Sequence, residues 1–442
     1  MGLKQKINVF KGGVSVPHHK RTEDCEVIRM DLPRKVIIPM VQHIGAPCLP
    51  LVKKGDYVKV GQKIGDAESS FSSPVHSSVS GTVADVRPVL YAGGVEVVSV
   101  EIETDGLQEV YEHIAPLVVS DPKELVKAIR ESGLVGLGGA GFPTAVKLNP
   151  PADKPVDTLI INGAECEPFI TSDYREMMDN TQGIIDGIKI IMDITGIKKA
   201  YIGIEGNKPK AIKKFTALLK NDPSITVVKL RTRYPQGGEK QIIFAVTGRK
   251  VPAGKLPSDV GVLVQNVNTA SFIAEYVKTG MPLIKKSVTV DGSAVSEPKN
   301  LEVLIGTPLK DVFDFCGGFS QTPEKIIMGG PMMGVAQFSL DNTVVKHTNA
   351  LLAFGKKEAC LPSESVCIKC GKCVSACPMN LMPLFLNACV EKNRVEDCVS
   401  YGINDCIECG CCSYVCPASR NLVQSFRYAK AELRKRAHKA KK

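Results

Sequence analysis

The pattern of hydrophobic and polar positions changes several times along the chain, and each change predicts a different kind of structure. Between residues 31 and about 105, short apolar runs alternate with turn residues without helical periodicity, which is typical of short β-strands. From residue 121, helical patterns alternate with β-runs, as in a mainly parallel α/β layer. Residues 284 to about 340 return to short strands around one helical segment, and the composition becomes cysteine-rich from residue 356.

The α/β part begins with the helix DPKELVKAIRES, in which Asp121 is the expected N-cap and Pro122 the first helical residue. Gly133 ends this helix and opens a glycine-rich loop. The segments expected after the loop are the β-run DTLIINGAECEP, the helix REMMDNTQGIIDGIKIIMDITG, the strand AYIGIEG, the helix KPKAIKKFTALLKND and the strand ITVVKL.

Composition narrows the class of protein. The 442 residues are 44% hydrophobic and 23% charged, so the chain is long enough for several domains and is not wholly disordered, collagenous or a coiled coil. No apolar run approaches the roughly 18 residues that span a bilayer, and the start, MGLKQKINVFKGG, lacks a secretory leader. We therefore expect a cytoplasmic protein whose cysteines bind metal rather than form disulfides.

Most of the net charge lies in the tail at residues 420–442. The whole chain carries 56 basic and 46 acidic side chains, a net charge of +10. The tail carries nine Lys or Arg against Glu432, and so contributes +8. The nearly neutral body argues against a nucleic-acid-binding protein. Leu422, Phe426 and Leu433 share one face of a predicted amphipathic helix that fits a complex partner or anionic lipids, the alternative being a frayed terminus.

Two cysteine runs give the strongest chemical signal. Each reads C-x2-C-x2-C-x3-C-P, the bacterial run for two [4Fe–4S] clusters, in which the fourth cysteine ligates the other cluster. The first cluster is predicted on Cys367, Cys370, Cys373 and Cys416, and the second on Cys406, Cys409, Cys412 and Cys377. Zinc is the alternative, but it usually takes two CxxC pairs. The remaining cysteines of this region, Cys360, Cys389, Cys398 and Cys411, are expected to be small buried hydrophobes.

The loop GLVGLGGAGFPTAVK formally satisfies the dinucleotide fingerprint through Gly136, Gly138 and Gly141. A helix precedes it and Pro143 follows, whereas the fingerprint requires a preceding strand, so a standard Rossmann turn is not expected. The glycines still allow a flavin or phosphate to approach the backbone closely, and Lys147 can supply positive charge.

This loop, together with Asn162-Gly163-Ala164-Glu165-Cys166-Glu167-Pro168, resembles the NADH-binding, FMN-carrying subunit of respiratory complex I. That likeness covers roughly residues 121–350, while the segment with Lys54-Gly55-Asp56 and Ser80-Gly81-Thr82 resembles a biotinyl or lipoyl carrier barrel. No Lys lies between Lys63 and Arg87, so a structural or docking barrel is expected instead of a carrier. With the cysteine runs, the whole chain resembles the C subunits of the Rnf complexes.

The resemblance implies a multidomain α/β and β protein. The expected domains are a barrel-sandwich hybrid at 1–115, a Rossmann-like FMN- and NADH-binding domain at 116–281, a small β-grasp-like SLBB domain at 282–352, a helical two-cluster ferredoxin module at 353–419, and the basic tail at 420–442. The residues it implies for FMN or NADH binding are Gly136, Gly138, Gly139, Gly141, Phe142, Lys147, Asn162, Glu165, Glu167, Glu239, Asn266, Asn268 and Thr269.

The resemblance also implies the function. We expect a peripheral subunit, on the cytoplasmic face of the membrane, of an ion-translocating ferredoxin:NAD⁺ oxidoreductase. Its cofactors would be FMN, NAD(H) and two [4Fe–4S] clusters, its partners the membrane subunits of the complex and, indirectly, ferredoxin. No catalytic side chain beyond FMN is needed. Lys240 stands where the family has a second acid, and Ala164 stands for an Asp, so cofactor affinity could differ. The alternative is a non-enzymatic iron–sulfur adaptor with a vestigial flavin domain.

Overall fold

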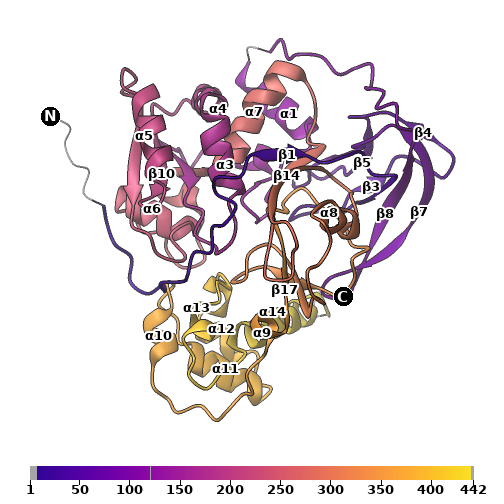
Figure 1. Ribbon diagram of the computed structural model, residues 1–442. Helices are drawn as coiled ribbons and strands as arrows, with labels where there is room; N and C mark the ends of the chain where they lie inside the picture. The colour runs from indigo at the N-terminus through magenta and orange to yellow at the C-terminus, as the bar shows by residue number, and fades with distance from the viewer. Residues whose placement is uncertain (1–6, 120, 440–442) are drawn as a thin grey trace.

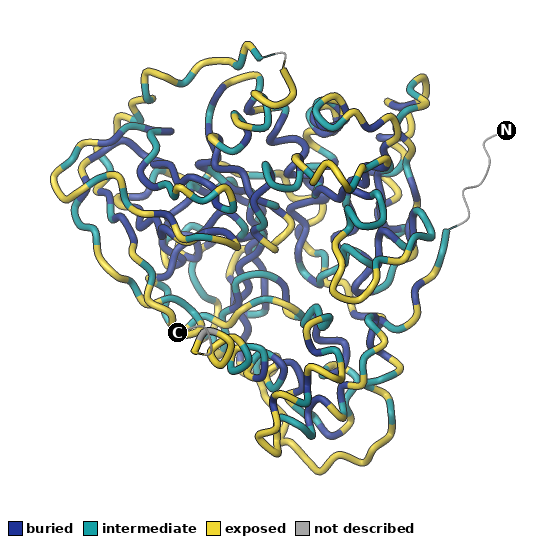
Figure 2. Tube along the Cα trace, turned by 180° about the vertical axis from the view of Figure 1, so that it is seen from behind, coloured by how far each residue is buried: buried dark blue, intermediate teal, exposed yellow. Residues whose placement is uncertain are grey.

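The structure is a computed structural model that describes residues 7–119 and 121–439. Figure 1 shows four packed parts: the barrel in indigo and purple, the α/β domain in magenta, a central β domain in orange and a helical module in yellow. Figure 2 shows that buried residues fill the interior of these parts, while exposed residues lie at the outer surface. No described helix is long and apolar enough to cross a membrane.

The barrel consists of two small sheets around one core of aliphatic side chains. Its strands are β2 (Lys35–Pro39), β3 (Leu49–Pro50), β4 (Tyr57–Val58), β5 (Lys63–Asp66), β6 (Val75–His76), β7 (Gly81–Tyr91) and β8 (Val95–Thr104). The connection between β6 and β7 is buried, and the Ser78 hydroxyl donates to the Ile305 carbonyl at 2.6 Å. A carrier domain needs an exposed tip for modification, so this buried connection suits a docking role.

The α/β domain has a four-stranded parallel sheet with helices on both faces. Its strands are β9 (Thr158–Gly163), β10 (Lys199–Glu205), β11 (Ile225–Leu230) and β12 (Val262–Asn266). Its helices are α1 (Pro122–Glu131), α2 (Thr144–Leu148), α3 (Ser172–Asp179), α4 (Thr181–Thr195), α5 (Pro209–Leu218), α6 (Glu239–Thr247) and α7 (Val267–Thr279), with the 3₁₀ turn η1 (Pro257–Val260). Leu159 and Ile161 join one core and Ile160 the other, as expected for a strand buried on both sides.

Two local predictions can be compared with these helices. The Asp121 side chain accepts from the Lys123 amide at 3.2 Å, which confirms the predicted N-cap of α1. The single helix predicted from Arg175 was wrong, because Asn180 leaves the helical region at φ −126° and ψ 41° and separates α3 from α4.

The central β domain has a six-stranded sheet in the order β1-β14-β13-β17-β15-β16. Its elements are β1 (Val27–Arg29), β13 (Lys285–Asp291), β14 (Lys299–Leu304), α8 (Leu309–Phe315), β15 (Lys325–Met328), β16 (Val335–Gln337) and β17 (Ala350–Phe354). Strand β1 pairs in parallel with β14, so Val27–Arg29 extend the central sheet although they precede the barrel strands in the sequence. The sequence could not reveal this pairing because its partner lies some 270 residues later.

The helical module contains α9 (Lys356–Ala359), α10 (Lys372–Ala376), α11 (Pro383–Glu391), α12 (Asp397–Ser400), the 3₁₀ turn η2 (Ile403–Asp405), α13 (Cys411–Tyr414) and α14 (Leu422–Lys439). The predicted tail helix is confirmed to Lys439, and the remainder of that prediction, residues 440–442, lies outside the described part of the chain. Its apolar face is not free for a membrane, because Leu422 and Phe426 are buried against Leu386 of α11 and Leu433 packs on the same core. Helix α14 is thus part of the module.

Candidate cofactor and iron–sulfur sites

The strand order reverses at β9, and parallel α/β sheets have a ligand-binding crevice at such a reversal. We call the region at the carboxyl ends of β9 and β12 the crevice. The chain adds β10 and β11 on one side of β9 and then returns to add β12 on the other. Asn162 and Asn266, at the carboxyl ends of these two strands, are register partners. Ligands of parallel α/β sheets bind at such a switch point, so two predicted site residues lie where a cofactor is expected.

The glycine loop closes one side of this crevice. The Gly136 amide donates to the Phe142 carbonyl at 2.8 Å, and the Leu137 amide donates to the Thr269 hydroxyl at 3.0 Å. Gly139 has φ +107°, and a Cβ placed there would meet only the Asn349 side chain, at 3.8 Å. The loop is therefore held at its base, and its glycine tip leaves an open backbone surface.

The N-terminus of α7 lies directly beside the loop. Asn266 is its N-cap and accepts from the Asn268 amide at 2.9 Å, and a Cβ on Gly138 would lie 3.2 Å from the Asn266 side chain. The Asn266 and Asn268 side-chain amides both donate to Asp173, at 2.7 and 2.6 Å. Asn268 and Thr269 are buried, so in this structure they hold the loop and Asp173 in place.

Lys147 and Glu239, predicted separately, form an ion pair of 2.6 Å. The Lys147 ammonium also lies 5.6 Å from the centroid of the Phe142 ring, which packs edge-on against Phe71 of the barrel. Asn162 donates to the Gly237 carbonyl at 2.8 Å, which fixes the segment before α6. The structure thus brings these predicted residues around one crevice.

Glu165 and Glu167 are directed to neighbouring backbone. Glu165 is buried and accepts from the Asp173 amide at 2.7 Å, and burial raises the pKa of its carboxyl to about 7. Glu167 accepts from the Met332 and Met333 amides, both at 3.0 Å, and burial raises its pKa to about 7 as well. Glu167 therefore joins the α/β domain to the central β domain, whereas Glu165 fixes the start of α3.

Two site residues were missed by the sequence analysis. Asp173 holds both asparagines of the crevice, but nothing in its sequence context distinguishes it from an ordinary first-turn acid. Lys20 comes from the N-terminal segment, residues 8–25, and its ammonium donates to the carbonyls of Glu165 at 3.0 Å and Glu167 at 2.8 Å. The run His18-His19-Lys20 was the only signal that could have pointed to it.

The residues at the crevice fit a flavin mononucleotide. The open glycine surface leaves room for a flat ring or a phosphate at Gly139. The N-terminus of α7 supplies positive potential for a phosphate, and Lys147 lies nearby in its ion pair with Glu239. Phe142 and the side chain of Asn162 complete the lining.

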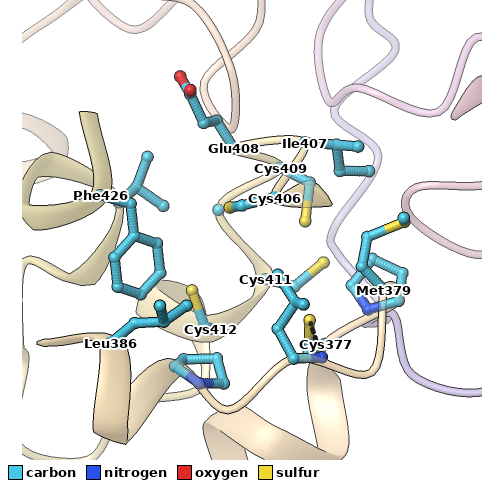
Figure 3. A pocket seen from close by; sticks show the side chains of 15 residues that line it. Cys377, Met379, Leu386, Cys406, Ile407, Glu408, Cys409, Cys411, Cys412 and Phe426 are labelled. Atoms are coloured by element: carbon cyan, nitrogen blue, oxygen red, sulfur yellow. Dashed lines mark hydrogen bonds between the residues drawn. The ribbon is translucent and has the colours of Figure 1, made fainter. Parts of the chain in front are cut away.

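The second cysteine run folds around a pocket of its own, shown in Figure 3. Four predicted ligands of one cluster, Cys377, Cys406, Cys409 and Cys412, line it together with Cys411. The other lining side chains are mostly apolar, with Leu386 and Phe426 fully buried. Cys377 lies far in sequence from the other three thiols, so this arrangement supports the predicted cross-ligation. Four thiols in an apolar pocket fit a [4Fe–4S] cluster.

The first run is more open. Cys367 and Cys370 are exposed, whereas Cys373 and Cys416 are half-buried. Burial raises the pKa of the Cys373 thiol. Among the other cysteines, Cys360 is exposed, so the expectation that it is buried was wrong.

Four family models match the chain. The Nuo51 FMN-binding domain matches residues 129–275, the RnfC barrel sandwich hybrid domain matches 8–107, the SLBB domain matches 287–336 and the 4Fe-4S dicluster domain matches 366–419. Their order agrees with the predicted fold class.

Curated relatives match over nearly the full length. The C subunit of the Na⁺-translocating ferredoxin:NAD⁺ oxidoreductase complex of Acetobacterium woodii is 47% identical over 98% of each chain. The proton-translocating counterpart of Clostridium ljungdahlii is 45% identical over 97% of this chain and 94% of its own. The C subunit of the ion-translocating oxidoreductase complex of Rhodobacter capsulatus is 41% identical over 97% of this chain and 83% of its own.

Solved structures share the fold at low sequence identity. The NAD⁺-reducing [NiFe]-hydrogenase in its air-oxidised state matches 69% of this chain and 63% of its own, with a TM-score of 0.51 and 17% identity. Its H₂-reduced state gives a TM-score of 0.50, with 70% of this chain and 62% of that chain covered. These structures bear on the fold alone.

Proposed function

The chain belongs to the family of C subunits of ion-translocating ferredoxin:NAD⁺ oxidoreductase complexes, and on that premise we propose that it is the NADH-oxidising or NAD⁺-reducing subunit of such a complex. It would bind peripherally to the membrane subunits, on the cytoplasmic side. The complex I-like FMN domain and the dicluster domain support this assignment. The single observation that carries it is the glycine loop placed at the switch point between β9 and β12.

The proposed FMN site is the crevice described above. Its flavin or phosphate would lie against Gly136, Gly138, Gly139 and Gly141, beside Phe142, Lys147 and Asn162. The α7 N-terminus at Asn266 would face the phosphate, with Asn268 and Thr269 holding it from behind. Glu239 holds the ammonium of Lys147, and Glu165 and Glu167 fix the adjoining segment. NAD(H) would enter over the exposed tip of the loop.

The chemistry belongs to the cofactors: bound FMN exchanges a hydride with the nicotinamide and converts the electron pair into single electrons, which iron–sulfur clusters carry. Two [4Fe–4S] clusters are proposed, one on Cys367, Cys370, Cys373 and Cys416 and one on Cys406, Cys409, Cys412 and Cys377. The apolar lining of the second pocket keeps water from its cluster, and water access influences cluster potential. The side chains of this protein would therefore bind and orient the cofactors and shield them from water.

The test is anaerobic purification followed by quantitation of flavin and iron and by stoichiometric addition of NADH. We expect one FMN, about eight iron atoms for two cubanes, and bleaching of the flavin by NADH together with reduced-cluster EPR signals. Protein with full iron content that binds no flavin and does not react with NADH would instead be the non-enzymatic adaptor.

A further inference from the structure

The helical module meets the α/β domain through the segments around the second pocket. The Tyr234 hydroxyl donates to the Cys409 carbonyl at 2.7 Å, and the Gln241 side chain donates to the Pro378 carbonyl at 3.3 Å. At the edge of the contact, the Gly254 amide donates to Asp405 at 2.9 Å. The second pocket is therefore anchored directly to the domain that holds the flavin crevice.

The N-terminal segment covers this junction from another side. The Gly13 amide donates to the Ala376 carbonyl at 2.8 Å, and Val14 forms a bridge with Tyr234. A Cβ on Gly12 would lie only 2.4 Å from the Cys377 carbonyl oxygen, so the backbone is packed tightly there. Tyr234, Val14, Cys409 and other buried side chains form one apolar cluster. The contact between the α/β domain and the second pocket is thus buried.

The first cysteine run has the opposite environment. The loop from Cys360 to Cys370 is exposed along its whole length and forms the outer edge of the module, where Figure 2 shows a continuous yellow stretch. Its large apolar side chains face solvent: Leu361 is 76% exposed, Val366 84% and Ile368 71%. These side chains flank the predicted ligands Cys367 and Cys370.

Two cations adjoin this apolar surface. Lys369 and Lys372 are exposed, and neither forms an ion pair with any residue that the structure describes. An apolar centre with unpaired lysines at its edge is complementary to a protein surface with an apolar centre and an acidic rim. A bilayer surface could also attract it, but lipids accept no electrons, and the thiols of the cluster lie within the patch.

We infer that electrons pass between the crevice and the second-run cluster first, and that the loop 360–372 around the first-run cluster docks an acidic surface of a one-electron carrier subunit of the complex. The inference rests on the proposed function and adds the order of the clusters and the exit surface. One NADH releases two electrons and one proton, and the electrons cross both clusters singly to reduce two equivalents of the carrier. In the reverse direction, electrons from the carrier cross the first-run cluster and then the second-run cluster to reduce NAD⁺.

The order is tested on the holoprotein without using NADH. Dithionite-reduced protein is mixed with a dysprosium chelate, which speeds the relaxation of exposed paramagnetic centres. The variants Cys370→Ser and Cys409→Ser identify the EPR signals of the first-run and the second-run cluster, respectively. We expect the first-run signal to relax several-fold faster and the second-run signal to change little. Equal or reversed effects would overturn the order. Failure of NADH to reduce the intact protein would count against the proposed function alone, because this readout needs neither FMN nor NADH.

The docking surface is tested with Ile368→Glu and Leu361→Glu, with Leu107→Glu as control, since Leu107 is 75% exposed on the distant barrel. The probe is membranes that retain the other subunits of the complex and have been stripped of this one. At equal iron content, we expect both loop variants to bind about tenfold more weakly, and the control to bind normally. Unchanged binding by both loop variants would overturn the surface. If both loop variants also bound protein-free phosphatidylglycerol vesicles more weakly by the same factor, the loop would contact lipid, and this result would overturn the protein-docking surface as well.

Discussion

At the scale of single residues, Gly139 is where a side chain should separate flavin binding from the iron–sulfur clusters. Its φ of +107° lies in the region that other residues avoid, and open space adjoins it. We expect Gly139→Val to weaken FMN binding by at least about tenfold, which corresponds to about 1.4 kcal/mol, because the side chain occupies the proposed ring volume. Flavin content and NADH:ferricyanide activity measure the loss, while iron content and the reduced-cluster EPR signal should stay unchanged.

Gly93→Val is the matched control for this variant. Gly93 also has a positive φ, of +89°, and open space around it, but it lies in the β7–β8 turn of the barrel. It should cost similar backbone strain without loss of FMN. Lys147→Ala should have a milder effect than Gly139→Val, because it removes charge without filling the crevice. An iron-replete Gly139→Val protein that binds FMN normally would contradict the assignment of the loop.

The sequence predicted the role of a residue only where the residue belonged to a motif with recognisable spacing. The glycines, Lys147 and Asn162 stand in a recognisable motif order, and their role in FMN binding stays a prediction. Asp173 and Lys20 could not be found, since their roles arise from contacts with Asn266 and with the backbone at Glu165. These contacts join segments far apart in the chain and leave no local pattern.

At the scale of elements, the two cysteine runs are predicted to exchange their fourth ligands. Cys377 lines the pocket of the second run although it belongs to the first in sequence. We expect Cys377→Ala to destabilise the second cluster selectively and to lower the iron content toward about half. EPR of the reduced protein and iron analysis measure this. Loss of the first-run cluster with the second one intact would show that each run holds its own cluster.

Helix α14 should stabilise the module rather than anchor the protein to lipid. Phe426 is 1% exposed in a core shared with α11 and Cys412. We expect Phe426→Ala to lower stability by about 3–5 kcal/mol, measured as earlier thermal bleaching of the clusters under anaerobic conditions. Tyr428→Ala on the same helix is the control, since Tyr428 is 51% exposed.

A Phe426→Ala protein of wild-type stability would contradict the packing of α14.

The helix itself was predictable from its apolar spacing, but its partner was not. The same pattern of Leu422, Phe426 and Leu433 suits a bilayer surface or a protein core, and only the position of α11 decides between them.

At the scale of the molecule, the order of the four folds was predictable from motifs along the chain, while the joints between them came from the structure. Lys346 gives the clearest example of such a junction. It belongs to the central β domain, and its buried ammonium donates to the Pro74 carbonyl in the barrel and to the Gly133 carbonyl at the glycine loop, the latter at 2.6 Å. Such a lysine resembles any other in sequence. Its role exists only because three domains meet around it.

This joint should make stability depend on pH. Burial lowers the pKa of Lys346 from 10.5 to about 7. Between these values the unfolded chain binds a proton that the folded protein does not, so folding becomes more favourable as the pH rises from about 7 toward 10, by at most about 1.4 kcal/mol per pH unit. The Lys346→Met variant has no titrating group at this position and therefore lacks this pH-dependent contribution to stability. The difference in melting temperature, wild type minus variant, should therefore increase between pH 7 and 9.5, whereas the exposed-site control Lys54→Met should show no such trend. A difference that stays constant or shrinks over this range would mean that Lys346 remains charged in the folded protein.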